Sequence, residues 1–311
     1  MLVDEEQAGQ RVDNFLLTKL KGLPKSRIYQ MIRKGELRIN KGRAKPTTRV
    51  EGGDLIRLPP LQLDLAKPIS VSSGLNEVLQ QSVLFEDDVL LILNKPSGLA
   101  VHAGSGIRVG VIEALREMRT DLAYLELVHR LDRETSGCLV LAKRASALRT
   151  LHDEFKNSSL KTGRMDKRYL CLVKGQWKYG ERRVEKPLDT QARRGGERHV
   201  VVSKQGVYAC SIMSSLQVRP NASLVEVKLL TGRTHQVRVH AQSEGHVIAG
   251  DKRYGDDVFN QELKKIGLNR LFLHAARLSF AHPITGERVD FSAPLPKDLT
   301  QVLQQLEFDK A

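Results

Sequence analysis

The chain has 311 residues, 41% of them hydrophobic and 5% aromatic, which is typical of a folded protein with about two domains and too apolar for a disordered one. Lysine plus arginine number 50 against 36 aspartates and glutamates, for a formal net charge of +14. The three cysteines form no CxxC pair, so neither a disulfide framework nor a zinc ribbon is predicted. The start at Asp4, Glu5 and Glu6 lacks a signal-peptide pattern, and no apolar run approaches the roughly 18 residues of a membrane span. We therefore expect a cytoplasmic protein with no membrane association.

The positive charge is concentrated in two tracts. Residues 11–49 contain 12 basic and two acidic side chains, and residues 143–204 contain 17 basic and 7 acidic ones, so each tract carries +10. Against a total of +14, the rest of the chain is net acidic. A general surface bias toward basic residues would not be partitioned in this way. We interpret the tracts as two surfaces that bind a polyanion.

Residues 11–58 have the pattern of a small module of helices and strands. Apolar residues from Val12 onward recur at helical spacing and predict a first helix. A second helix is predicted after Pro24, with Ser26 as its N-cap or start signal and Gly35 as its end. The remaining predicted elements are strands over 37–40 and 55–58 and turns at 41–42 and 52–54.

The segments GQRVDNFL and KSRIYQMIRKGELRINKGRAKPTTRVEGGDLIRL of this module resemble the S4 RNA-binding domain. In that family the second helix and the following turn present cations to the RNA backbone. The alternative is that several of these cations belong only to a solvated helix face. The cations that the resemblance assigns to RNA binding are Lys25, Arg27, Arg33, Lys34, Arg38, Lys41, Arg43 and Lys45.

A stretch rich in proline and serine follows Pro59 and Pro60 and predicts a linker. We assign residues 1–62 to an S4-like RNA-binding domain, 63–80 to the linker and 81–311 to a second domain.

In this second domain short strands alternate with helices. The loop 129–137 lies between two apolar runs and is crowded with charged residues. Charges in such a loop are costly to bury unless they are paired or used, so the loop is a candidate functional segment. The predicted elements are strands over 83–85, 89–93, 125–128, 138–142, 167–173 and 225–230, a helix over 111–118, and a helix that contains Arg238.

The loop sequence HRLDRETSG, with NKPSG before it and TGRTHQVRVH after it, resembles the RluA branch of the pseudouridine synthases across residues 81–311. The resemblance implies an α+β fold in which a mixed, mostly antiparallel central sheet carries a cleft. It also implies an isomerase that converts uridines of 23S ribosomal RNA to pseudouridine without a metal or other cofactor. Nothing in the sequence suggests more than a monomer.

The resemblance assigns the reacting groups. Asp132 is implied to be the ionised carboxylate that acts as nucleophile or steering base, although an aspartate in this context also suits a turn. Arg238 is implied to pair with Asp132, and Arg233 is the second choice for that role. Tyr169 is implied to stack on the flipped uracil and to assist removal of the C5 proton; the alternative is a tyrosine packed in the core.

Further residues are assigned to RNA binding. Arg130 is implied to fill the space left by the flipped base, and Leu273 to form an apolar wall of the base pocket. Lys95 contacts a phosphate near the site or supports the loop. His235 and His240 are expected to serve packing and hydrogen bonding, with no third metal ligand.

The chain departs from the family pattern at one place, and two alternative functions are left open. Relatives usually carry a Lys-Pro pair where this chain has residues 206–209, so the RNA contact of that lysine is in doubt. The alternatives are a non-catalytic RNA-binding assembly factor and an S4-containing enzyme that acts on tRNA. Which uridines are modified depends on RNA shape and is not encoded in a motif.

Overall fold

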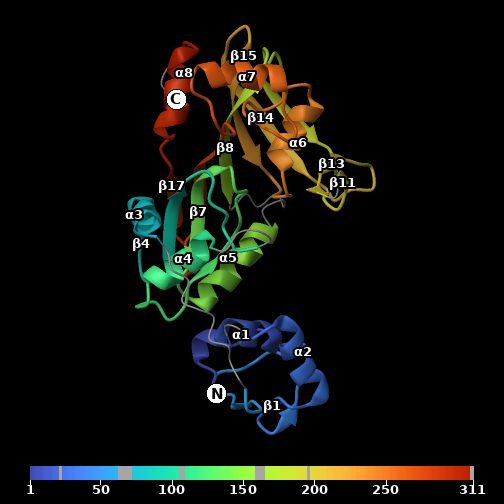
Figure 1. The fold of residues 1–311 in the computed structure, drawn as a ribbon, viewed down its shortest axis with the longest axis vertical. Coiled ribbons are helices and arrows are strands. Elements are labelled where there is room, and N and C mark those ends of the chain that lie inside the picture. Colours follow the sequence, from blue (N-terminus) through green and yellow to red (C-terminus); the bar gives the residue numbers. More distant parts are fainter. Residues whose placement is uncertain (21–22, 62–71, 105–108, 158–164, 195–196, 309–311) are drawn as a thin grey trace. The chain divides into compact units, whose positions relative to one another are not determined.

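The structure is a computed structural model that describes residues 1–311 except 21–22, 62–71, 105–108, 158–164, 195–196 and 309–311 (Figure 1). Its contacts define two compact units, one of Met1–Ser70 and one of Val71–Lys143 with Ala147–Ala311. Each unit has its own hydrophobic core and is described by itself. In the part of the chain that the structure describes, no helix is long and apolar enough to cross a membrane.

The first unit contains two helices and a small antiparallel sheet. Phe15, Ile28 and Met31 are fully buried between these elements, as the helical spacing predicts. Gly35 ends the second helix in a left-handed conformation with φ of 68°. The elements are η1 Glu5–Gln7, α1 Val12–Lys19, α2 Lys25–Lys34, β1 Arg38–Ile39, β2 Gly42–Arg43 and β3 Ile56–Arg57, and the strand order is β2-β1-β3.

The helix α2 starts directly after Pro24 as predicted, but Ser26 is not its N-cap. Pro24 occupies the N-cap position and α2 begins at Lys25, so Ser26 lies inside the first turn and its hydroxyl does not cap the helix. The extended backbone of Pro24 already directs the chain into the helix.

The second unit is built on one ten-stranded sheet with the order β4-β5-β7-β16-β8-β15-β14-β9, to which β17 and β6 pair at the side. Among the described strands of this sheet, β7 and β16 form the one parallel pair, which confirms the predicted mixed, mostly antiparallel sheet. The strands are β4 Val83–Glu86, β5 Leu90–Lys95, β6 Glu126–Leu127, β7 Ser136–Ala142, β8 Asp166–Lys174, β9 Glu181–Glu185, β14 Cys210–Val218, β15 Ala222–Leu229, β16 Leu273–Ala281 and β17 Arg288–Ser292.

Helices cover both faces of this sheet (Figure 1). Alternate residues of β7 enter different cores: Leu139 packs with α4, whereas Val140 packs with α5. At the other end of the sheet, α6 packs on one face and α7 and α8 pack on the other. The helices are α3 Ser73–Gln81, α4 Val111–Met118, α5 Ala145–Asn157, α6 Gln236–Ser243, α7 Asp257–Lys265 and α8 Lys297–Gln305.

Two short hairpins extend from the β14 end of the sheet. They consist of β10 Leu188–Asp189 with β13 Val201–Val202, and of β11 Arg193–Arg194 with β12 Glu197–Arg198.

The predicted linker 63–80 is too long at its C-terminal end. Residues from Ser73 onward form α3, whose N-cap Ser72 accepts a hydrogen bond from the Leu75 amide. Leu79 is fully buried among the side chains of α4 and β5. This burial anchors α3 in the second unit; residues 62–71 lie outside the described part of the chain.

Candidate active site

The loop 129–137 is held by the turn that follows β5. The Gly98 amide donates to the Arg133 carbonyl at 2.8 Å, and the Arg133 guanidinium donates back to the Gly98 carbonyl at 3.0 Å. The Ser97 hydroxyl donates to the Glu134 carbonyl at 2.7 Å. Inside the loop, the Thr135 amide donates to the Asp132 carbonyl at 3.1 Å and closes a turn. The NKPSG segment therefore fixes the backbone on which Asp132 is carried.

Two alternative roles are predicted for Lys95. Its side chain is fully buried, and its Nζ donates to the carbonyls of Pro96, Leu99 and Arg133 at 2.8, 2.9 and 3.2 Å. Burial, with a smaller contribution from the charge of Arg270, lowers the pKa of Lys95 to about 7. A side chain enclosed by three carbonyls in this way favours the second alternative, support of the loop, over contact with a phosphate.

We expect Lys95→Met to destabilise the protein by about 3 kcal/mol, because methionine fills the space but leaves buried carbonyls without a donor. The turnover rate should also fall, since the loop that carries Asp132 loses its support. Chemical denaturation and a turnover assay measure both effects. Lys174→Met removes an exposed lysine paired with Asp256 and should change the free energy of unfolding by less than about 0.5 kcal/mol. An equal effect of the two substitutions would contradict the assigned role of Lys95.

The end of the loop requires glycine at position 137. Gly137 has φ of 111°, and a Cβ placed on it would lie 2.3 Å from the carbonyl oxygen of Ala275 in β16. This close approach allows β7 and β16 to pair in parallel at Gly137 and Ala275. The pairing places the loop beside the start of β16.

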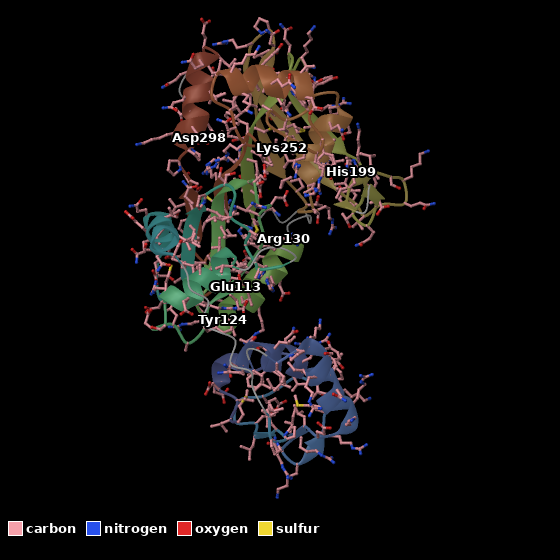
Figure 2. All side chains as sticks on the ribbon, in the orientation of Figure 1. Glu113, Tyr124, Arg130, His199, Lys252 and Asp298 are labelled. Atoms are coloured by element: carbon pink, nitrogen blue, oxygen red, sulfur yellow. The ribbon has the colours of Figure 1, made fainter. Side chains whose placement is uncertain are left out.

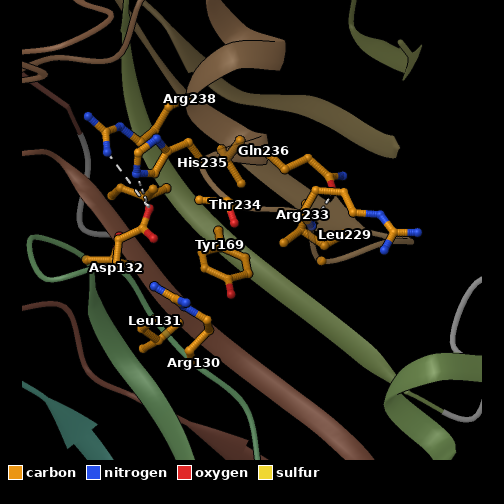
Figure 3. Close-up of a pocket in the computed structure, with 14 residues that line it drawn as sticks. Arg130, Leu131, Asp132, Tyr169, Leu229, Arg233, Thr234, His235, Gln236 and Arg238 are labelled. Carbon is orange, nitrogen blue, oxygen red and sulfur yellow. Dashed lines mark hydrogen bonds and ion pairs between the residues drawn. The ribbon is translucent and has the colours of Figure 1, made fainter. Parts of the chain in front are cut away.

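A pocket of about 100 Å³ opens where this loop meets the N-terminal end of α6 (Figure 3). Tyr169 forms its centre and packs against the hydrophobic clusters at both ends of the sheet. Six of the residues predicted for the site line this one pocket, namely Arg130, Asp132, Tyr169, Arg233, Arg238 and Leu273. Folding brings them together from the loop, β8, β16 and the segment that leads into α6.

The Asp132 carboxylate faces two side chains of this segment. Its Oδ2 lies 3.9 Å from Nη1 of Arg238 and 3.9 Å from Nε2 of His235 (Figure 3). The predicted pairing with Arg238 is therefore an ion pair at long range without a hydrogen bond. The Asp132 side chain keeps 21% of its surface exposed, so its oxygens remain accessible from the pocket.

Asp251 is the principal partner of Arg238 and was missed by the sequence analysis. Its two carboxylate oxygens accept bonds of 2.7 Å from Nε and Nη2 of Arg238. Asp251 is almost completely buried; burial alone would raise its pKa, but the hydrogen bonds and charge of Arg238 and the amides of Arg253 and Tyr254 outweigh it and lower the pKa. A polar run, GDKRYGD, directly after the apolar Val247–Ala249 was the available signal.

Tyr169 is half-buried and keeps its proton at neutral pH. Burial raises the pKa of the phenol, and the negative charge of Asp132 raises it further. The ring therefore offers a flat face and a hydroxyl group rather than a phenolate. Tyr169 lines the pocket, whereas the alternative expectation was a tyrosine packed in the core.

His235 and His240, at the start of α6 and inside it, differ in their surroundings. His240 is fully buried, with Nδ1 beside the Ser211 hydroxyl and Nε2 beside the Lys186 carbonyl, in agreement with the predicted packing role. His235 packs on the Tyr254 ring and hydrogen-bonds its hydroxyl, as expected, but it also lines the pocket, which was not predicted.

A second hollow, of about 360 Å³, adjoins the first and shares Arg130, Asp132, His235 and Arg238 with it. Its further lining residues include three cations, Arg133, Lys252 and Arg253. Arg130 and Lys252 are both exposed, and Figure 2 labels them in the second unit. The Asp132 carboxylate thus borders a larger hollow in whose lining cations outnumber the carboxylates, which include Glu134 and Asp251.

Arg233 also lines the first pocket. Its side chain is held by residues 206–209, the segment in which this chain departs from the family pattern. Its Nε donates to the Tyr208 carbonyl at 3.0 Å. Gly206 packs so closely that a Cβ would lie 2.4 Å from the carbonyl carbon of Leu188. This backbone admits no larger residue at Gly206, which is why a lysine does not fit there.

In the first unit, the cations predicted for RNA binding lie on α2 and the strands after it. Arg27 is half-buried and pairs with Glu36 at 3.0 Å, and Arg38 is also half-buried. The others are exposed, and these are Lys25, Arg33, Lys34, Lys41, Arg43 and Lys45.

A loop carrying a carboxylate thus meets a tyrosine and a guanidinium at one pocket on a mixed sheet, as the resemblance to the pseudouridine synthases implies. The chain belongs to the RNA pseudouridylate synthase family, RluA branch: residues 89–243 match that family and residues 10–56 match the S4 domain. It is accordingly an isomerase. The "Ribosomal large subunit pseudouridine synthase C" of Haemophilus ducreyi is 48% identical over 99% of this chain and 95% of its own length. The protein of that name in Escherichia coli K12 is 48% identical over 98% and 95%.

A solved structure agrees with this assignment. The structure of "Human RNA Pseudouridylate Synthase Domain Containing 4" superposes with a TM-score of 0.61 at 26% identity, covering 75% of this chain and 95% of that one. The segments GQRVDNFL, VHAGSG and GLNRLFLHAA favour synthase C over synthase D of the same branch, and the curated relatives confirm that resemblance.

Proposed function

We propose that this enzyme converts specific uridines of 23S ribosomal RNA to pseudouridine, with Asp132 as the reacting carboxylate. One observation carries the proposal: the pocket presents an accessible Asp132 carboxylate beside Tyr169, flanked by two donors that are anchored to other groups. The names of the curated relatives support the large-subunit substrate. We further propose that it acts as a cytoplasmic monomer.

The reaction explains these residue types. The N1–C1′ bond breaks, the uracil turns, and a C5–C1′ bond forms; C5 loses a proton and N1 gains one, so no atom is gained or lost. Asp132 attacks the sugar or the base as a nucleophile, or acts as a base that steers cleavage. The target nucleotide must first leave its stack, and Arg130 on the loop is placed to occupy the vacated space. Leu273 supplies an apolar surface to the flipped base.

Tyr169 is suited to assist the removal of the C5 proton after the uracil has turned. Burial is the main cause of the raised pKa of its phenol, and the charge of Asp132 adds to it. When Asp132 loses its charge on bonding to the nucleotide, this contribution ends and the phenol becomes a better participant in proton exchange at C5. Throughout, the ring can stack on the uracil.

The cationic hollow is suited to RNA phosphates beside the target nucleotide. We expect Lys252→Gln to weaken RNA binding several-fold and to reduce the slope of log K against log salt by about 1, with little change in the rate of the bound complex. Lys265→Gln, at the far end of α7, is the matched control and should leave the slope unchanged. Filter binding at several salt concentrations measures the slope, and equal slopes for the two variants would contradict the assignment. The exposed S4 cations form the second RNA-binding surface.

The function is tested by incubating the purified enzyme with unmodified 23S rRNA and with tRNA transcripts and mapping pseudouridine in both. The proposal requires modification of a few defined uridines of the rRNA. Modification of tRNA alone would support the tRNA-acting alternative, and binding of rRNA without modification would support the assembly factor.

A further inference from the structure

A chain of hydrogen bonds fixes the protonation of His235. Tyr254 is almost fully buried, and its hydroxyl oxygen accepts a hydrogen bond of 2.9 Å from the Val200 amide. The same hydroxyl lies 2.8 Å from Nδ1 of His235. If Nδ1 carried a proton, the buried hydroxyl hydrogen would have no acceptor among the described residues. The hydroxyl therefore donates to Nδ1, and the ring carries its proton on Nε2.

This Nε2–H points toward the Asp132 carboxylate, because Nε2 lies 3.9 Å from Oδ2 of Asp132 (Figure 3). The backbone of His235 directs the ring there through a left-handed conformation with φ of 54°, which is uncommon for a residue other than glycine. The side chain makes no capping bond to α6, although His235 occupies its N-cap position. Capping the helix is therefore not the reason for this conformation.

The ring is neutral at physiological pH. Burial lowers the pKa of His235 to about 4; among the charged groups around it, Asp132 and Asp251 oppose this shift, whereas Arg238 and Arg253 add to it. A neutral ring with one fixed N–H is a directional donor. An imidazolium would instead form an ion pair with Asp132.

We propose that His235 is a positioning residue whose Nε2–H, together with Arg238, holds one oxygen of Asp132 during the reaction and leaves the other free to react. The proposal rests on the proposed function, since it takes Asp132 as the reacting group. Both donors are anchored, His235 by Tyr254 and Arg238 by Asp251, and both stand about an ångström beyond hydrogen-bond distance. The carboxylate therefore moves toward the donors when the nucleotide enters.

Two substitutions separate this role from a structural one. His235→Asn suits the left-handed backbone but is too short for its amide to reach Asp132, so we expect normal stability and a fall in kcat on the order of 10²-fold. His235→Gln fits the backbone less well but carries an N–H at the distance of Nε2, so we expect reduced stability and a kcat within about tenfold of the original. KM for the RNA should change little in both. His246→Asn, at a half-exposed histidine outside the pocket, is the control.

The tautomer is measured directly by long-range ¹H–¹⁵N correlation of the histidine rings in the intact enzyme between pH 5 and 8. We expect the neutral Nε2–H form of His235 throughout, and a mixture of tautomers in Tyr254→Phe. A proton on Nδ1 in the original enzyme, or an unchanged kcat in His235→Asn, would overturn the proposal. If Asp132→Asn kept full activity, the assignment of Asp132 would fail while the tautomer result still stood, so the two failures are distinguishable.

Discussion

Replacing Asp132 by asparagine is expected to lower the rate of isomerisation by at least about 10⁴-fold while leaving the fold and RNA binding intact. The amide has the same size but is neutral and can neither attack carbon nor steer cleavage as a base. Among the described residues the carboxylate accepts no side-chain hydrogen bond, and Arg238 keeps its partner Asp251. The substitution therefore removes a reacting group without leaving a buried charge unpaired.

The rate is measured in single turnovers as release of tritium from C5 of labelled uridine, because this proton must leave C5 in the reaction. Denaturation and RNA binding are measured in parallel. Asp121→Asn, at an exposed aspartate paired with Arg119, is the control and should react at the original rate. A rate for Asp132→Asn within about tenfold of the original would show that another group carries the chemistry.

Breaking the buried pair of Arg238 and Asp251 is expected to damage stability and activity together. Asp251→Asn leaves the Arg238 charge buried without its partner, which costs about 3–5 kcal/mol of unfolding free energy. The released guanidinium lies 3.9 Å from Asp132 and should close onto it. A guanidinium freed from Asp251 can bind both oxygens of Asp132, including the one that must stay free to react, so we expect kcat to fall on the order of 10²-fold.

The double variant Arg238→Met with Asp251→Leu distinguishes these two effects. Replacing both members of a buried ion pair by apolar residues often restores stability, so the free energy of unfolding should recover by several kcal/mol relative to Asp251→Asn. Activity should not recover, because Asp132 has lost one of its two donors. Full activity in the double variant, or no loss of stability in Asp251→Asn, would contradict the role given to this pair.

The success of the sequence predictions depended on how local each signal was. The hairpin of β4 and β5 and the helix α4 follow from the period of apolar residues within a single segment, and both were predicted within one or two residues. The S4 and loop motifs identified the family because their residues are contiguous. The predicted pocket residues are brought together by the sheet order, which places β16 between β7 and β8.

The predictions fall short where tertiary contacts decide. Lys95 is the last residue of β5 and is followed by a polar turn in the sequence, and its burial depends on the loop that folds over it. The composition around Ser72 is that of a linker, yet one buried leucine, Leu79, anchors the helix that follows. The partner of Arg238 and the tautomer of His235 depend on contacts with Asp251 and Tyr254, and local sequence does not show that these segments meet.

The most direct test of the account uses a strain that lacks the gene and receives either the original enzyme or Asp132→Asn, with pseudouridines mapped across the 23S rRNA. The account predicts that a small set of sites is lost in the deletion strain, returns with the original enzyme and stays absent with Asp132→Asn at equal protein level. Restoration of those sites by Asp132→Asn, or an unchanged 23S rRNA in the deletion strain, would contradict it.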